Sequence, residues 1–190
     1  MQMGPTDEEI ARKIQRGENN EVFGILVERY ESKMTRYARK FFSNGDDVKD
    51  IVQEIFIKAY TNIQSFDASR RFSPWLYRIA HNELVNLVRK KSKQPFFSFD
   101  MDALFPHLAA KETADADINA REIKEAISRT LNKLDLKYRE PLALYYVEEL
   151  SYQEIADVLE IPVATVGVRI SRGKSKLKKL YEDNFGKYER

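Results

Sequence analysis

The chain contains no cysteine, only seven glycines and six prolines, and no long apolar run. The absence of cysteine excludes disulfides and thiolate metal sites. Its two histidines, His81 and His107, lack companions at metal-ligand spacing, so we predict no metal centre and no other cofactor. No stretch approaches the roughly 18 continuous apolar residues of a membrane span, and no apolar signal core is visible. These features predict a cytoplasmic protein without membrane insertion.

Strand signals are missing as well, because alternating apolar and polar runs bounded by turns do not occur at useful length. Apolar residues instead recur at three- and four-residue steps, which predicts an all-α protein. The helical segments form two groups, at residues 1–93 and 118–190. Residues 94–117 lose the period and contain Pro95 and Pro106. We therefore expect two small helical domains joined by a flexible linker, the second containing a helix-turn-helix.

The formal net charge of +2 conceals a division along the chain. Residues 89–93 (RKKSK) and 163–190 are basic, whereas residues 98–117 are acidic. Two basic patches joined by an acidic connector predict that a polyanion is held at two places.

The first group of helices begins with a short helix at residues 7–16, for which Thr6 is a plausible N-cap and Gly17 follows the end. A longer helix is expected at residues 20–42. A third helix, at residues 46–63, has an apolar arc for the core.

The opposite side of this third helix carries Asp50, Gln53, Glu54 and Ile57. An isoleucine among acids and an amide favours a docking surface. The alternative is a solvated face with one stray aliphatic residue, which is common because single exposed apolar side chains are normal.

Aromatic and basic residues interleave after this helix. Pro74 is expected in the first turn of another helix that ends near Lys91, with Ser73 as its N-cap. Interleaved aromatic and basic side chains can stack an unpaired base and hold the surrounding phosphates. The candidate nucleic-acid contacts are Phe66, Arg70, Arg71, Phe72, Trp75, Arg78, Asn82, Asn86 and Arg89. The alternative for the aromatic residues is a place in the core.

The most legible motif lies in the second domain. Ser151 and Glu154 form an S-x-x-E capping box at the start of one helix, LEIP supplies a tight turn, and a second helix begins near Pro162 or Val163. This is the helix-turn-helix pattern. Its outward-facing residues are candidates for contacts with base edges and phosphates. They are Ala164, Thr165, Val168, Arg169, Ser171, Arg172 and Lys174. A solvated charged helix is the alternative.

In combination, three motifs resemble those of the extracytoplasmic-function (ECF) sigma factors of bacterial RNA polymerase. They are DDVKDIVQEIFIKAY, FSPWLYRIAHNELVNLVR and LSYQEIADVLEIPVATVGVRISRGKSKL, in that order. The resemblance implies a polymerase-binding helix, a segment that melts the minus-ten promoter element, and a helix-turn-helix that reads the minus-thirty-five element. It implies a non-enzymatic initiation subunit whose partners are core RNA polymerase, through the β′ clamp helices and the β subunit, and promoter DNA.

By this resemblance, Asp50, Gln53, Glu54 and Ile57 are candidate contacts with the β′ clamp helices. The loop before Phe72 is expected to hold a flipped non-template base. An anti-sigma factor is implied as a further partner, and the free protein is expected to be monomeric.

Four residues depart from those common in the family, so the sequence predicts no promoter preference. They are Asn86, Leu136, Glu160 and Val168. Glu160 stands where the turn often has glycine, and strain is expected if its backbone adopts a positive φ.

Three other interpretations compete with this one. A conventional helix-turn-helix regulator would bind duplex operator DNA without polymerase. A nuclease would use acids such as Asp46, Asp47 and Asp50, although no nucleophile-base set or phosphate-cradling glycine loop is visible. A sigma-like regulator that has lost initiation activity would share the motifs.

Overall fold

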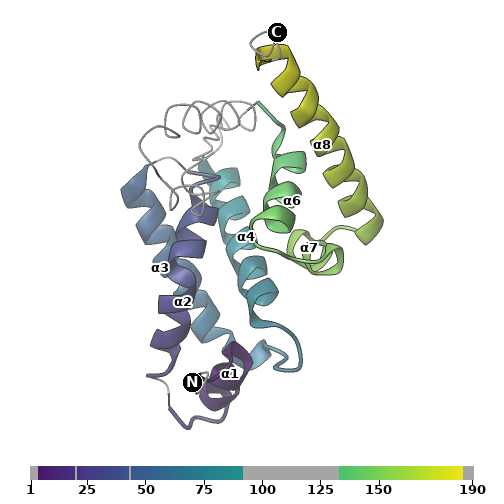
Figure 1. Cartoon of the computed structure of the whole chain (residues 1–190). Coiled ribbons are helices and arrows are strands. Elements are labelled where there is room, and N and C mark those ends of the chain that lie inside the picture. The colour runs from purple at the N-terminus through teal and green to yellow at the C-terminus, as the bar shows by residue number, and fades with distance from the viewer. Residues whose placement is uncertain (1–3, 20, 43, 92–132, 186–190) are drawn as a thin grey trace, which may run out of the picture. The chain divides into compact units, whose positions relative to one another are not determined.

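The computed structural model describes residues 4–19, 21–42, 44–91 and 133–185. In these ranges all regular structure is helical, with seven α-helices and one 3-10 helix, which confirms the all-α prediction (Figure 1). The chain divides into two compact units, Met1–Phe96 and Phe97–Arg190. The predicted linker, residues 94–117, lies outside the described residues. Among the helices that are described, none has the length and apolarity needed to cross a membrane.

The first helix of unit 1 is α1 (Asp7–Gln15), and it has the predicted cap. The Thr6 hydroxyl accepts a hydrogen bond from the Glu9 N–H at 3.2 Å, and the Glu9 carboxylate accepts one from the Thr6 N–H at 2.9 Å. This reciprocal pair is a capping box. Gly17 follows with φ +69°, a left-handed conformation that suits glycine after a helix end.

Three longer helices form the body of unit 1: α2 (Phe23–Ala38), α3 (Gly45–Thr61) and α4 (Phe72–Lys91). In Figure 1, α3 runs beside both α2 and α4, and α1 lies across one end near the short helix η1 (Ile63–Ser65). The predicted apolar arc of α3 is buried between its neighbours. The buried residues are Val48, Ile51, Val52, Ile55, Phe56 and Ala59.

Helix α2 is shorter than the predicted range of residues 20–42. After Ala38 the backbone tightens, because the N–H groups of Lys40 and Phe41 bond to carbonyls three residues earlier. This turn still brings the Phe41 ring into the core, where it is 2% exposed. The apolar period therefore continued beyond the end of the helix.

The predicted N-cap of α4 is wrong. The helix begins at Phe72, one residue before Ser73, and the Phe72 N–H donates to the Glu8 carboxylate of α1 at 2.9 Å. Pro74 is the third residue of the helix, where its missing N–H has no intrahelical partner to lose. A carboxylate from a distant part of the sequence thus replaces the local cap.

Unit 2 contains α6 (Leu136–Tyr146), α7 (Tyr152–Leu159) and α8 (Val163–Phe185), and both α6 and α7 pack against α8. The capping box at the start of α7 is confirmed, with 3.3 Å from the Glu154 N–H to the Ser151 hydroxyl and 2.7 Å from the Ser151 N–H to the Glu154 carboxylate. Val166 and Ile170 bury one side of α8. The helix-turn-helix of the prediction is therefore present.

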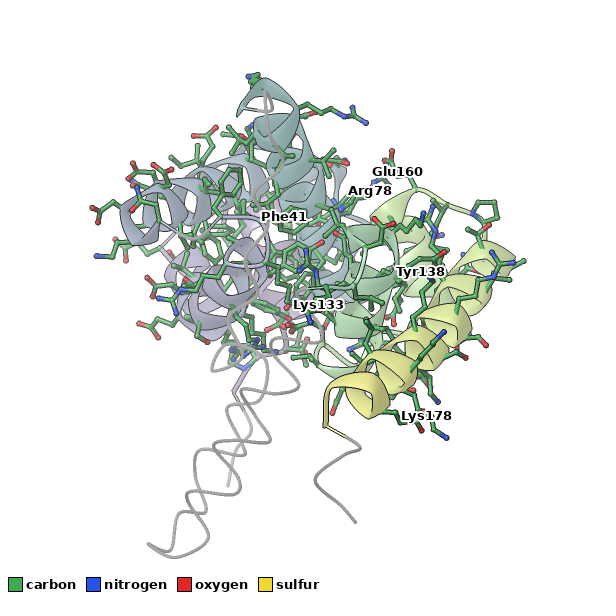
Figure 2. All side chains as sticks on the ribbon, turned by 90° about the horizontal axis from the view of Figure 1, so that it is seen from above. Phe41, Arg78, Lys133, Tyr138, Glu160 and Lys178 are labelled. Carbon is green, nitrogen blue, oxygen red and sulfur yellow. The ribbon has the colours of Figure 1, made fainter. Side chains whose placement is uncertain are left out.

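Close packing of α6 on α8 depends on Gly173. A Cβ atom at this position would lie 2.8 Å from Cδ1 of Leu142 and 3.4 Å from Cβ of Tyr138, which faces α8 (Figure 2). At Gly167 on the same helix, an added Cβ would meet only Tyr152 Cε2 at 3.5 Å, an ordinary contact. Only one of these two glycines is required by packing.

We expect Gly173→Ala to be less stable than Gly167→Ala by about 1–3 kcal/mol, because only the first methyl group overpacks a buried contact. Gly167→Ala, the matched control, is expected to match or exceed the wild type, since alanine favours a helix over glycine by about 1 kcal/mol. Urea unfolding followed by circular dichroism measures both. Equal stability of the two variants would contradict the packing argument.

Candidate functional site

The outward face of α3 is exposed at all four predicted positions, Asp50, Gln53, Glu54 and Ile57. The Ile57 side chain is 48% exposed, which is a large apolar surface to leave in water. Glu54 lies 3.7 Å from Lys58, which also hydrogen-bonds to Glu83 of α4. That bond raises the pKa of Lys58 and keeps it a cation. The face therefore combines two exposed acids with an apolar side chain, and a basic residue borders it.

A groove of about 600 Å³ lies between α2 and α3, and Gln53 and Ile57 belong to its wall. The rest of the wall is mostly apolar and comes from both helices. Its apolar residues are Phe23, Val27, Val52, Phe56 and Tyr60, and Glu31, Thr35 and Lys49 complete the wall. The Tyr60 ring is 38% exposed and packs edge-on against Phe23 with 5.2 Å between centroids. An apolar groove between two helices is a surface that can receive a helix of a partner.

Sequence reasoning found the α3 side of this groove but missed the α2 side. The periodicity of a single helix identifies its own exposed residues, whereas a groove needs the packing angle between two helices. Tyr60, an aromatic residue outside the apolar arc near the end of α3, was a signal that the apolar surface extends beyond that arc.

The 62–71 loop, which joins α3 to α4, holds two of the predicted basic contacts. Asp67 accepts hydrogen bonds from the Ser69 hydroxyl at 2.7 Å and the Ser69 N–H at 3.0 Å, and these bonds lower the pKa of Asp67. Arg70 lies 3.7 Å from the same carboxylate. Arg70 and Arg71 are both exposed on the loop. The turn thus has a defined shape and a basic surface.

The predicted aromatic contacts separate into two kinds. Phe66 and Phe72 are 5% and 1% exposed, and their centroids lie 5.4 Å apart. Trp75 packs on both rings, at 5.2 and 5.5 Å, but is only half-buried. Phe66 and Phe72 therefore agree with the alternative that these aromatic residues belong to the core, where they support the 62–71 loop from its buried side. Trp75 keeps part of its ring accessible beside the loop.

The remaining predicted residues of unit 1 lie on α4. Arg78, Asn82, Asn86 and Arg89 are all exposed, and their three- and four-residue spacing places them on one side of the helix. Together with Trp75 they form a polar strip that begins next to the 62–71 loop. The fold thus brings the loop arginines and this strip together.

In unit 2, the side of α8 that is predicted to contact DNA is accessible to solvent. Ala164, Val168, Ser171, Arg172 and Lys174 are exposed, while Thr165 and Arg169 are half-buried. The ammonium group of Lys174 lies 5.9 Å from the Tyr146 ring centroid of α6. A hydrogen bond to the Tyr146 phenol raises the pKa of Lys174. Lys174 is therefore oriented by Tyr146 of α6.

The turn between α7 and α8 contains the expected strain. Glu160 has φ 53° and ψ 45°, which is the left-handed conformation, and Figure 2 shows it at this turn. Its N–H still bonds to the Ala156 carbonyl and closes α7. A left-handed conformation costs a residue with a Cβ atom roughly 1–2 kcal/mol.

We expect Glu160→Gly to stabilise the protein by up to about 1 kcal/mol, because the relief of left-handed strain exceeds the added chain entropy of glycine. Glu149 also has φ 53°, so Glu149→Gly offers a second test outside the helix-turn-helix. Thermal unfolding measures both variants against the wild type. A lower midpoint for Glu160→Gly would show that contacts of the glutamate outweigh the strain.

The described residues thus form a helical protein with an exposed acidic face that includes Ile57 on one unit and a helix-turn-helix, the motif of DNA-binding proteins, on the other. No cluster of three or more His, Asp or Glu residues suited to a metal ion occurs in the described ranges.

Comparison with known proteins then defines the family. The family model for sigma-70 region 2 matches residues 26–94, and that for sigma-70 region 4 matches residues 124–177. The ECF RNA polymerase sigma factor SigW of Bacillus subtilis is 34% identical over 178 residues, covering 90% of this chain and 95% of SigW. The ECF RNA polymerase sigma-E factor of Escherichia coli K12 is 34% identical, with coverages of 89% and 91%. The chain belongs to the ECF sigma factor family.

Solved structures agree with this assignment. CnrH, solved in complex with the cytosolic domain of CnrY, has a TM-score of 0.68 and 29% identity, with 94% of this chain and 99% of CnrH covered. The sigma factor RpoE of Bartonella quintana, in complex with the anti-sigma factor NepR, shares the fold at a TM-score of 0.63 and 22% identity, with 84% and 96% covered. Sigma factors are initiation factors and not enzymes, so the family decides against the nuclease interpretation.

Proposed function

We propose that this chain directs transcription initiation by docking unit 1 on core RNA polymerase and by contacting promoter DNA with both units. The observation that carries the docking step is the acidic face of α3, whose exposed Ile57 borders the apolar groove against α2. A partner helix that covers Ile57 removes this apolar surface from water. Basic side chains on such a helix can pair with Asp50 and Glu54. The β′ clamp helices are the partner proposed for this face, and the β subunit is a further contact.

The promoter contacts follow from the two exposed basic surfaces. In unit 1, Arg70 and Arg71 of the 62–71 loop hold phosphates near the minus-ten element. The half-buried Trp75 stacks an unpaired base, and the polar strip of α4 contacts the duplex edge. In unit 2, Arg169 and Arg172 of α8 read the minus-thirty-five element in the major groove, where an arginine can donate two hydrogen bonds to guanine.

An anti-sigma factor completes the proposed set of partners. RpoE and its anti-sigma factor NepR were solved as a complex, and CnrH was solved with the cytosolic domain of CnrY. A protein that covers the α3 face or the polar strip of α4 would prevent docking or DNA contact. We propose that this chain is controlled in this way, acts in the cytoplasm, and is monomeric when free.

Reconstituted transcription tests the docking proposal. Purified protein is added to sigma-free bacterial core polymerase on a genomic fragment library, and RNA 5′ ends are mapped. New start sites that share two upstream motifs are expected. They should be lost with Asp50→Ala/Glu54→Ala and weakened with Ile57→Ala, because the docking face loses its charge or its apolar contact.

The matched control is Glu21→Ala/Glu28→Ala, which removes the same charge from exposed positions outside the α3 face. It should leave start-site yield and core-polymerase affinity unchanged. Tight binding to duplex DNA without polymerase, and no new start sites, would support the conventional regulator. Absence of start sites despite polymerase binding would indicate a sigma-like regulator without initiation activity.

We expect Arg172→Ala to weaken promoter binding by the holoenzyme by about 1–3 kcal/mol and to relax sequence preference at one position of the minus-thirty-five element. Lys178→Ala is the control, because Lys178 is an exposed cation further along α8, 3.7 Å from Glu182 (Figure 2). It should affect all promoter variants about equally. Binding to a set of minus-thirty-five variants measures both effects, and a uniform loss for Arg172→Ala would reject base readout by this residue.

A further inference from the structure

We propose that α1 is the positioning element of the 62–71 loop, and that Arg12 and Gln15 are positioning residues for promoter opening. This inference rests on the proposed role of the loop in opening the minus-ten element. Helix α1 precedes the segment matched by the sigma-70 region 2 model, which starts at residue 26. The family match therefore assigns no role to α1.

Three side chains on one side of α1 hold the loop and the start of α4. Glu8, Arg12 and Gln15 are spaced by four and three residues, so they line up along the helix. The Gln15 amide donates to the carbonyls of Ile63 and Phe66, both at 2.8 Å. Arg12 donates to the Ala68 carbonyl at 2.7 Å. With the Glu8 carboxylate on the Phe72 N–H, the contacts extend from one end of the loop to the other.

All of these contacts are made to the backbone of the 62–72 segment. A hydrogen bond to a carbonyl or an N–H fixes the path of the chain, whatever its side chains are. The Gln64 side chain returns a bond to the Gln15 carbonyl at 3.2 Å. The conformation of the loop is therefore set by α1 together with the local Asp67–Ser69 turn, while the side chains of Arg70 and Arg71 stay exposed.

Helix α1 can serve as a fixed support because its other contacts anchor it. Ile10, Ala11 and Ile14 are buried. Asp7 accepts hydrogen bonds from Arg29 and Tyr30 of α2, both at 2.6 Å. Burial, together with the bond to Asp7, raises the pKa of Tyr30, so the phenol stays protonated and keeps donating. The loop is thus connected through α1 to the body of unit 1.

Ordering a loop before it meets its ligand lowers the entropy lost on binding. A loop that helps to capture an unpaired base must present Arg70 and Arg71 beside Trp75 of α4 at the moment the duplex opens. If α1 releases the loop, base capture has to order it again, and opening becomes slower. The affinity of unit 1 for core polymerase, which depends on the α3 face, should be unaffected.

The test compares wild type with Arg12→Ala/Gln15→Leu in the holoenzyme, on a promoter mapped by the transcription assay. Two templates are used: the intact duplex and the same promoter with a mismatched, already open minus-ten region. We expect the duplex-to-open ratio of initiation rates to fall about tenfold, the equivalent of one to two net hydrogen bonds. Core-polymerase affinity should stay at the wild-type value. Lys13→Ala, which removes an exposed charge from the same helix, is the control for charge loss.

The outcomes separate the possibilities. An equal loss on both templates leaves the ratio unchanged; it would mean that α1 only stabilises the fold, and it would overturn the proposal. Wild-type rates on both templates would overturn it as well. If the double variant is unfolded at the assay temperature, Arg12→Ala alone applies, because its contact with Ala68 is exposed; Arg12→Lys, which still carries a donor, should restore the ratio. A wild type that initiates on neither template would reject the proposed function rather than the role of α1.

Discussion

The burial of α3 between α2 and α4 is the constraint on which the rest of unit 1 depends. Each fully buried aliphatic or phenylalanine side chain on its apolar arc contributes about 1.5–3 kcal/mol to folding, so the helix has one stable rotation about its axis. That rotation decides which residues remain outside. The acidic face with Ile57, the wall shared with α2, and the exit point of the 62–71 loop all follow from it.

Local sequence signals predicted the parts of the structure that are themselves local. The period of three and four residues identified most of the helices, and the N-cap at Thr6 and the capping box at Ser151 were visible as short patterns. The left-handed backbone at Glu160 was raised as a possibility by the resemblance, because the family often has glycine at this position of the turn. These features depend on residues within one helical turn of each other, so a sequence can display them directly.

The features that were missed are contacts between distant segments. Glu8 caps α4 in place of Ser73, and α2, α3 and η1 lie between Glu8 and Phe72 in the sequence. Phe66 and Phe72 are buried, a choice between base contact and core that the sequence left open. The amino-acid composition of a segment indicates what the segment can bind, whereas the burial of its side chains depends on which other helices pack against it. For the same reason the α2 wall of the groove and the hydrogen bonds from Gln15 to the loop could not be predicted.

The ammonium group of Lys58 is shared between two carboxylates, one on its own helix and one on α4. If a cation of a partner attracts Glu54 away, Lys58 retains Glu83 as its counter-ion, and no charge is stranded at the edge of the new interface. Association then exchanges one exposed ion pair for another. Salt screens the ion pair that Glu54 loses and the ion pair that it gains about equally. Glu54 would therefore help to orient the complex with little effect on how its affinity depends on ionic strength. Asp50 would supply the salt-sensitive part of the attraction.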